Sequence, residues 1–461
     1  MNDLFGKTLR PLMDGAEVKE RALAEALSYD TTYISKWLNG SKLPSSRNAE
    51  SVIRQMAGFL TCQKGGGDSE EQELFHALKT AYDRDSSYIS FQAYNNHKTS
   101  FLRGRQEVIE LLNDALLQMP HADGRDIVIT ASFDLFSLYR EDITVLIKTL
   151  QSTGAQRIRL TAVLSPEALH SDERFYTGSL LDIIGGLDYI EMSILAGNAG
   201  MPEILTISDV FCMQILWNTG GETAAVFSSD REVVVEFARV QGRCLSGLES
   251  LLAPARPEEL RRTNVQLDSY ADKRQWLFFN EPPALLFPDE IMDQLIANAQ
   301  TEEYTAYLRK LKSIFAGRTS KSRVDLVLYA SVINRYLAEG TVSVGNVEHR
   351  LSPEQAQAHL QHLSWLMREN PDFDIWLIRD TTMLSDAALS DAALSDAGCR
   401  APSLFIDTIS VYIENAQPDA HGNFHISMDP RMREAFQVSF ERMLHQPYCT
   451  KLTPEDLLRY L

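Results

Sequence analysis

The segment from Leu23 to Pro44 constrains the fold of this 461-residue chain most strongly, because its apolar spacing suits two short helices joined by a tight turn. Each helix has three apolar residues at helical spacing: Leu23, Ala24 and Leu27 in the first, and Ile34, Trp37 and Leu38 in the second. We expect the turn at residues 28–30, with Asp30 or Thr31 capping the second helix. Gly40 suits a left-handed residue at its end.

The outer face of the second helix is polar. It consists of Thr31, Thr32, Tyr33, Ser35, Lys36 and Asn39. Such side chains supply donors and acceptors suited to bases and phosphates. We therefore expect a helix-turn-helix whose second helix contacts double-stranded DNA. The alternative is a helix pair of the same shape that binds only protein.

Residues from about Leu4 to Leu60 resemble the lambda-repressor and Cro-like (Xre) helix-turn-helix family. The shared features are Leu23-Ala24, the Ile34-Ser35-Lys36-Trp37 run, Asn39-Gly40 and Pro44. The resemblance implies helices near 4–13, 19–27, 31–39, 46–55 and 56–60. The chain has Glu20 and Ser28 where the family usually has Gln and Gly, and a carboxylate repels phosphate, so we expect Lys19 to take that contact. The predicted DNA-binding residues are Lys19, Thr31, Thr32, Tyr33, Ser35, Lys36, Asn39 and Lys42.

Charge is distributed unevenly along the chain. There are 44 Lys plus Arg against 63 Asp plus Glu, a net charge of −19. Residues 1–60 contain eight Lys or Arg against seven Asp or Glu, a net of +1, which leaves −20 for the other 401 residues. An acidic body weakens non-specific attraction to DNA. We therefore expect a homodimer that contacts two half-sites.

Cysteine usage and hydropathy indicate a cytoplasmic protein with no membrane partner. The cysteines are scattered, odd in number and without Cys-x-x-Cys spacing: Cys62, Cys212, Cys244, Cys399 and Cys449. They predict reduced thiols, with neither a zinc site nor a disulfide framework. The sequence has no apolar run of about 18 residues and no signal-peptide pattern at its start.

The length leaves room for more than one domain, since single cores seldom exceed roughly 250–300 residues. Gly65-Gly66-Gly67 predicts a linker, so the DNA-binding head is expected over 1–63 and a helical connector over 64–125. Helices are predicted over 69–82 and 101–118. Their apolar stripes suit either a subunit contact or packing within their own domain.

From Asp126 the sequence alternates short apolar runs with amphipathic helices, which is typical of an α/β fold. The predicted strands are 127–130, 158–164, 203–208, 212–217, 224–227, 324–330, 373–379, 403–406, 410–413 and 424–427. The predicted helices are 138–151, 231–252, 353–368 and 432–444.

This order of elements recurs, and a strand ends at Ser-x-Asp before a helix at both 228–230 and 427–429. We therefore predict a multidomain chain with an all-α helix-turn-helix head and an α/β body of two pseudo-repeated halves. The halves are 126–252 and 323–461, joined by a helical connection over 253–322.

The element order over 126–252 and 323–446 resembles the phospholipase D-like fold. Active members carry His-x-Lys-x-x-x-x-Asp in each half. Here the corresponding hairpins, Thr206–Val210 and Leu404–Thr408, contain neither His nor Lys, and His97-Lys98 lies outside the repeats. The resemblance implies a catalytically degenerate body that binds without turnover, so we expect no enzyme activity.

The remaining motifs predict no cofactor and no metal. His359 and His362 have a metal-like spacing without a third ligand. The glycines at 65–67 and 185–186 lack the residues of a phosphate-binding loop. The LSDAA repeats from Leu384 indicate an inert loop. The aromatic and proline-rich stretch 274–288 suits either core or a pocket between the halves.

These observations favour a sequence-specific DNA-binding transcriptional regulator with a C-terminal sensor or oligomerisation body. The predicted partners are double-stranded DNA, a second copy of the chain, and a small-molecule or protein effector. The alternatives are a phosphodiesterase or nuclease with a non-standard site, and a protein-interaction scaffold.

Overall fold

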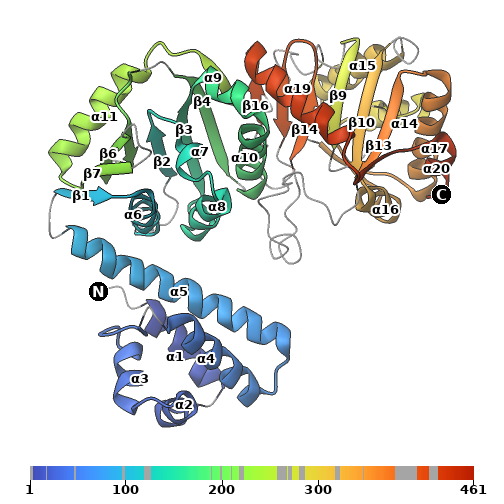
Figure 1. Cartoon of the computed structure of the whole chain (residues 1–461). Helices are drawn as coiled ribbons and strands as arrows, with labels where there is room; N and C mark the ends of the chain where they lie inside the picture. The colour runs from blue at the N-terminus through green and yellow to red at the C-terminus, as the bar shows by residue number, and fades with distance from the viewer. Residues whose placement is uncertain are drawn as a thin grey trace. The chain divides into compact units, whose positions relative to one another are not determined.

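Figure 1 shows the helices and strands of the chain in the computed structural model. The chain divides into two compact units. The first comprises Met1–Gly124, Lys148–Ala155 and Thr206–Ala238; the second comprises Arg125–Ile147, Gln156–Leu205 and Arg239–Leu461. The structure describes residues 4–16, 18–45, 48–95, 99–118, 126–187, 189–197, 200–208, 210–217, 223–256, 267, 272–279, 286–316, 322–345, 347–378, 402–414 and 424–461. The LSDAA repeats and His97-Lys98 therefore lie outside the described residues.

The N-terminal region is helical. Its helices are α1 (Leu4–Gly15), α2 (Glu20–Leu27), α3 (Thr31–Leu38), α4 (Ala49–Lys64) and α5 (Asp68–Asn95). The helices expected at 46–55 and 56–60 are one helix, which corrects the prediction; Ser46 itself is outside the described residues. The buried residues Val52, Met56 and Leu60 form one continuous stripe without a breaker, so nothing ends the helix at residue 55.

The connection between α2 and α3 follows from local chemistry. Ser28 ends α2 in the left-handed conformation, at φ 57°. Asp30 caps α3 by accepting a hydrogen bond from the Thr32 backbone N–H at 2.8 Å. On the inner side, α1 approaches α3 so closely that a Cβ on Gly6 would lie 2.5 Å from the Leu38 carbonyl oxygen. The two short helices are thus held in one arrangement.

The apolar core of these helices continues past residue 63, the expected end of the head. Leu74, Leu78 and Tyr82 of α5 are buried in the same cluster as Phe5 and the residues of α3. The Tyr82 hydroxyl also donates a hydrogen bond to the Pro44 carbonyl oxygen at 3.2 Å. The apolar stripe of residues 69–82 was predicted to form either a subunit contact or a contact within its own domain. In the structure it packs against the helices of its own unit.

The first unit also contains a group of antiparallel strands. In it β7 (Thr223–Ser228) lies between β1 (Thr99–Arg103) and β6 (Phe211–Trp217). The helix predicted over 101–118 is in fact β1 followed by α6 (Arg105–Leu117). Gly104, at φ 91°, separates the two elements, because its backbone conformation fits neither a strand nor a helix.

The second unit is built on a mixed sheet in the order β2-β3-β4-β8-β16-β15-β14-β9-β10-β13-β17. The strands are β2 (Asp126–Ala131), β3 (Arg157–Leu164), β4 (Ile190–Ala196), β8 (Ser250–Ala255), β9 (Arg274–Phe279), β10 (Arg323–Tyr329), β13 (Phe373–Ile378), β14 (Ser403–Ile406), β15 (Val411–Glu414), β16 (Phe424–Ser427) and β17 (Cys449–Lys451). The residues of β5 (Ile204–Ile207) are divided between the two units after Leu205. The strands β11 (Thr341–Val344) and β12 (Val347–Arg350) form a small separate sheet.

Helices accompany these strands through the rest of the chain. They are α7 (Leu135–Leu138), α8 (Ile143–Ser152), α9 (Pro166–Ser171), α10 (Glu173–Gly186), α11 (Arg231–Leu245), α14 (Asp289–Ala297), α15 (Glu302–Ala316), α16 (Ala330–Glu339), α17 (Pro353–Glu369), α19 (Pro430–Leu444) and α20 (Pro454–Leu458). Among the described residues, no helix combines the length and apolarity needed to cross a membrane.

One pattern of strand directions occurs twice in the second unit. The strands β2, β3 and β4 are parallel, and β8 is antiparallel to β4. Likewise β9, β10 and β13 are parallel, and β17 is antiparallel to β13. The strand β8 also pairs with β16, which makes one continuous sheet of both sets.

Three predicted segments need correction. The helix expected over 231–252 ends at Leu245, and after Gly247 the chain forms β8, a strand between β4 and β16. The helix expected over 138–151 is divided between α7 and α8. The connection 253–322, expected to be helical, contains β9, which is paired on both sides. Pairing with segments distant in the sequence stabilises β8 and β9. The spacing of apolar residues within each segment gives no information about such pairing.

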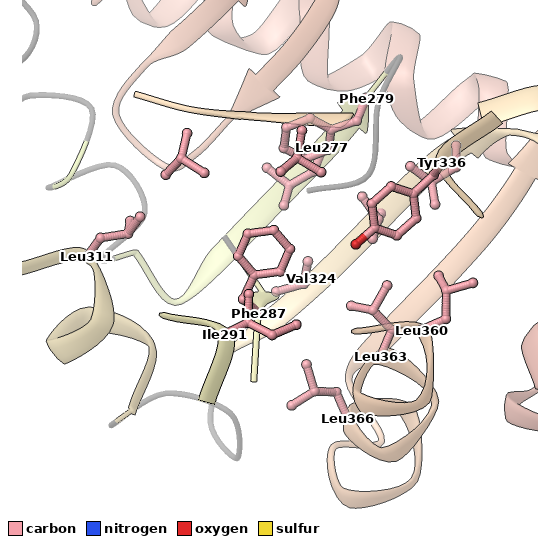
Figure 2. Packing of buried hydrophobic residues seen from close by; sticks show 14 of the residues in the cluster. Leu277, Phe279, Phe287, Ile291, Leu311, Val324, Tyr336, Leu360, Leu363 and Leu366 are labelled. Atoms are coloured by element: carbon pink, nitrogen blue, oxygen red, sulfur yellow. The ribbon is translucent and has the colours of Figure 1, made fainter. Parts of the chain in front are cut away.

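Figure 2 shows the core that packs against β9 and β10. Leu277 and Phe279 come from β9, and the α17 residues Leu360, Leu363 and Leu366 belong to the same buried cluster. Trp276, Phe278 and Phe279 are each at most 5% exposed. The aromatic stretch was predicted to be either core or the lining of a pocket, and most of β9 is core.

Candidate DNA interface and the cavity of the second unit

The outer face of α3 carries the polar residues predicted from the sequence. Its inner residues Ile34, Trp37 and Leu38 are buried. All the predicted DNA-binding residues are exposed: Lys19, Thr31, Thr32, Tyr33, Ser35, Lys36, Asn39 and Lys42. Lys19 stands at the start of α2 and Lys42 follows α3. The structure thus makes these side chains accessible, and their contacts with DNA remain a prediction.

Tyr33 is the centre of this exposed surface. Its side chain is 38% exposed. The Nζ atoms of Lys36 and Lys42 lie 5.8 Å and 5.0 Å from the centroid of its ring, within the range of cation–π attraction. The ring of Tyr29 contacts both Tyr33 and the buried Trp37, at centroid distances of 5.9 Å and 5.1 Å. The exposed ring is therefore anchored to the core and flanked by two positive charges.

Polar groups beside this ring are partly engaged within the protein. The Asn39 side-chain oxygen accepts a hydrogen bond from the Ser41 backbone N–H at 3.0 Å, which directs the amide donors to other partners. Hydrogen bonds from the side chain and backbone of Thr32 lower the pKa of Asp30, which keeps the cap ionised. On α2, Glu25 is paired with Arg21 at 3.0 Å. Asp30 and Glu25 thus have partners within the protein.

The predicted hairpin of the second unit is a turn held by carboxylates. The Asp407 side chain accepts hydrogen bonds from the backbone N–H groups of Ile409 and Ser410, both at 2.6 Å. Asp272 accepts a hydrogen bond from the Thr408 backbone N–H at 2.7 Å. Asp272 and Asp407 therefore stabilise the backbone of the turn.

Two histidines of the second unit, His359 and His425, are buried among structural partners. His425 Nε2 accepts a hydrogen bond from the Met192 backbone N–H at 3.0 Å, and burial lowers the pKa of His425 to about 3. His359 Nδ1 lies 2.8 Å from the Tyr336 hydroxyl, and burial lowers the pKa of His359 to about 3 as well. His362 instead stacks on Trp365 at 5.3 Å. In the part of the chain that the structure describes, no group of three or more His, Cys, Asp or Glu is placed to hold a metal ion.

A cavity of about 70 Å³ lies in the second unit, where α10 and α19 pack together. Its lining includes the hydroxyl residues Thr177 and Ser439, whose oxygens are 2.8 Å apart, and the aromatic residues Phe278, Phe436, Phe440 and Tyr448. Asp182 of α10 also lines the cavity and is 8% exposed. Burial raises the pKa of Asp182 to about 7.

Sequence reasoning missed this cavity. The available signal was a single acidic residue inside the apolar run Leu180-Leu181-Asp182-Ile183-Ile184. A carboxylate within such a run is unusual, because burying a charge is costly. The run alone gives no partner helix, and α19 is some 250 residues further along the chain.

Comparison with known proteins gives little further information. No family model matches the sequence, and no curated protein matches it. Among solved structures, the chain is similar to one titled as the structure of TrmBL2, an archaeal chromatin protein with a novel mode of DNA binding. That match covers 53% of this chain and 99% of the other, with 12% sequence identity and a TM-score of 0.25. A likeness at that TM-score carries no argument about fold or function.

Proposed function

We propose that this protein is a sequence-specific DNA-binding transcriptional regulator. In this proposal α2 and α3 form a helix-turn-helix of the Xre type, and the α/β region is a sensor or oligomerisation body. One observation carries the proposal. The helix α3 buries its apolar face and exposes an uninterrupted polar face around Tyr33, Lys36 and Lys42.

The chemistry of that face suits the major groove, which is wide enough for an α-helix. The Tyr33 ring offers an apolar contact for a thymine methyl group. Lys36 and Lys42 offer ammonium groups to guanine acceptors or phosphates, and Thr31 and Ser35 offer hydroxyl groups. Because Tyr33 is anchored through Tyr29 to the core, its position is set before DNA binds. Such preorganisation reduces the entropy lost on binding.

The charge distribution favours a dimer. The first 60 residues have a net charge of only +1, and the rest of the chain is strongly acidic. A single head would therefore neutralise few phosphates. Because phosphate contacts supply much of the affinity for DNA, one head alone would bind weakly. Two heads on half-sites one helical turn apart would supply both affinity and specificity.

We propose further that the α/β region is a pair of repeated halves resembling a catalytically degenerate phospholipase D-like fold. The recurring strand directions support this proposal, with the second set starting at β9 and not at residue 323. The two Ser-x-Asp sites add support. Ser228 and Ser427 each accept a hydrogen bond from the backbone N–H of the Asp two residues later, at 3.2 Å in both cases.

In such a regulator the body would act on the heads through an effector. A ligand changes an equilibrium only by its difference in affinity for two states. An effector that binds the body better in one arrangement of the paired heads would therefore change operator affinity, and DNA would change effector affinity by the same factor.

The test is a DNA titration. Bound sequences are selected by the full-length protein from a library of random duplexes, and the selected duplex is then titrated with wild type, Lys36→Ala and Asn39→Ala. Each variant should bind about five- to 150-fold more weakly, the equivalent of about 1–3 kcal/mol for a lost base contact. Arg10→Ala, an exposed cation on α1 outside the predicted set, is the control for charge alone. Failure to enrich any sequence, or unchanged binding by both α3 variants, would exclude the proposed interface.

A further inference from the structure

We infer that the cavity between α10 and α19 binds a small organic amine, with its ammonium group paired to the Asp182 carboxylate. The residues that line the site all belong to the second unit. Its role as the effector site rests on the proposed function.

Asp182 differs from the other buried acids of this protein in its environment. Its side chain is 8% exposed, and among the described residues its carboxyl group has no hydrogen-bond or ion-pair partner. Other buried carboxylates in this protein have partners: Asp325 is paired with Arg274 at 2.5 Å, and Asp407 accepts hydrogen bonds from Ser410. An unpartnered buried carboxyl group that lines a cavity is a position where a ligand cation gains most.

The rest of the cavity wall is rich in aromatic side chains. Four aromatic residues line the cavity: Phe278, Phe436, Phe440 and Tyr448. Aromatic rings attract cations and accommodate the alkyl part of an amine. The cavity has a volume of about 70 Å³. An engineered protein cavity of about 150 Å³ holds benzene, so a cavity of roughly half that volume suits a ligand of a few heavy atoms. An aliphatic monoamine has both the charge and the size.

The charged residues at the cavity do not favour an anionic ligand. The arginines that line the cavity are Arg174 and Arg442. Arg442 donates a hydrogen bond to Glu173, so its charge is already balanced. Arg174 is exposed, whereas Asp182 is buried. A ligand that enters far enough to displace water from the aromatic wall therefore meets the carboxyl group of Asp182.

The cavity lies between two helices that contact each other directly. The cavity is lined by α10 on one side and α19 on the other, and the Thr177 and Ser439 hydroxyl groups join them directly at 2.8 Å. Arg442 of α19 and Glu173 of α10 form a second link. A ligand in this cavity contacts both helices at once, so it would favour whichever packing of the pair encloses it. That is the property required of an effector.

Protonation gives the site a distinctive signature. An ammonium ligand favours ionised Asp182, so its binding releases a proton where the free carboxyl group is still protonated. With a pKa of about 7, the ionised fraction rises about tenfold between pH 6 and pH 8, and so should the affinity. The other titratable or charged groups at the cavity are Arg174, Arg442 with its partner Glu173, and Tyr448. These are residue types whose ordinary pKa values lie outside that interval.

The experiment is calorimetric titration of the full-length protein with n-butylammonium. The expected result is saturable binding that is about tenfold tighter at pH 8 than at pH 6, with proton release at pH 6. Butanol and butyrate, which match the alkyl chain, should fail to compete. Binding should be lost in Asp182→Asn and retained in Asp293→Asn, an exposed carboxylate on α14 away from the cavity.

Several results would overturn the inference. These are no saturable binding of n-butylammonium at millimolar concentration, preferential binding of butyrate, or unchanged affinity in Asp182→Asn. The selected DNA duplex is then titrated with and without the amine. Amine binding without any change in DNA affinity would refute the effector role. Absence of DNA binding, by contrast, would refute the proposed function and leave the calorimetric result on the cavity intact.

Discussion

Replacement of Asp182 by asparagine should stabilise the second unit at high pH. The side chain is 8% exposed and has no partner among the described residues, so its ionised form is disfavoured by burial. Asparagine has nearly the same shape and no charge. The variant therefore separates the cost of the buried charge from the packing of α10.

The sign and size follow from the pKa. Burial raises the pKa of Asp182 from 3.8 to about 7. The folded protein therefore keeps a proton that the unfolded chain loses above about pH 4, and stability falls as pH rises from about 4 to 7. Each pKa unit corresponds to about 1.4 kcal/mol, so the full cost above pH 7 is about 4 kcal/mol, of which about 3 kcal/mol develops between pH 5 and pH 8.

Urea unfolding of the full-length protein at pH 5 and pH 8 measures this effect. The free-energy difference between Asp182→Asn and wild type should increase by about 3 kcal/mol in favour of the variant from pH 5 to pH 8. A constant cost of burying the amide cancels in that comparison. Asp293→Asn, an exposed position, is the control. A difference that does not change with pH would show that Asp182 is not a buried unpaired acid.

Two further predictions concern the N-terminal helices and the body. Trp37→Ala should unfold the N-terminal helices and abolish DNA binding, since Trp37 is 1% exposed and such truncations cost about 3–5 kcal/mol. Trp365→Ala, at an exposed position, should leave thermal unfolding unchanged, and a Trp37 variant that kept the wild-type transition would contradict the assigned packing. Purified protein incubated with nucleic acid and with phospholipid should give no product above a buffer blank, because the hairpin at 404–408 has neither His nor Lys to act as nucleophile or to hold phosphate. Turnover that is lost on mutating a cavity residue would favour the enzyme alternative.

The elements predicted well from the sequence are those decided by near neighbours. The turn between α2 and α3 depends on Ser28 and Asp30, and both act within a few residues. The strand β9 was missed because its apolar run suits a buried helix or a pocket as well as a strand. Only its pairing with β10 and β14 distinguishes these possibilities.

The two candidate sites differ in the same way. The polar face of α3 is visible in the sequence because the helix itself defines it. The Asp182 cavity depends on contact between α10 and α19, which belong to different predicted halves of the α/β region. An isolated acid among leucines and isoleucines marks the position but does not identify the aromatic wall opposite. Such a site requires the tertiary structure.

The packing of α5 limits how this protein could exchange its N-terminal helices with relatives or in engineered chimeras. The glycines at 65–67 look like the natural place for a junction. A junction there would leave behind Leu74, Leu78, Ala81 and Tyr82, which complete the core of the preceding helices. The transferred helices α1–α4 would then expose an apolar surface that is prone to aggregation. The remaining chain would keep an amphipathic helix without the helices that it covers. Viable recombination points are therefore expected beyond Tyr82, so that α5 travels with the helices it covers.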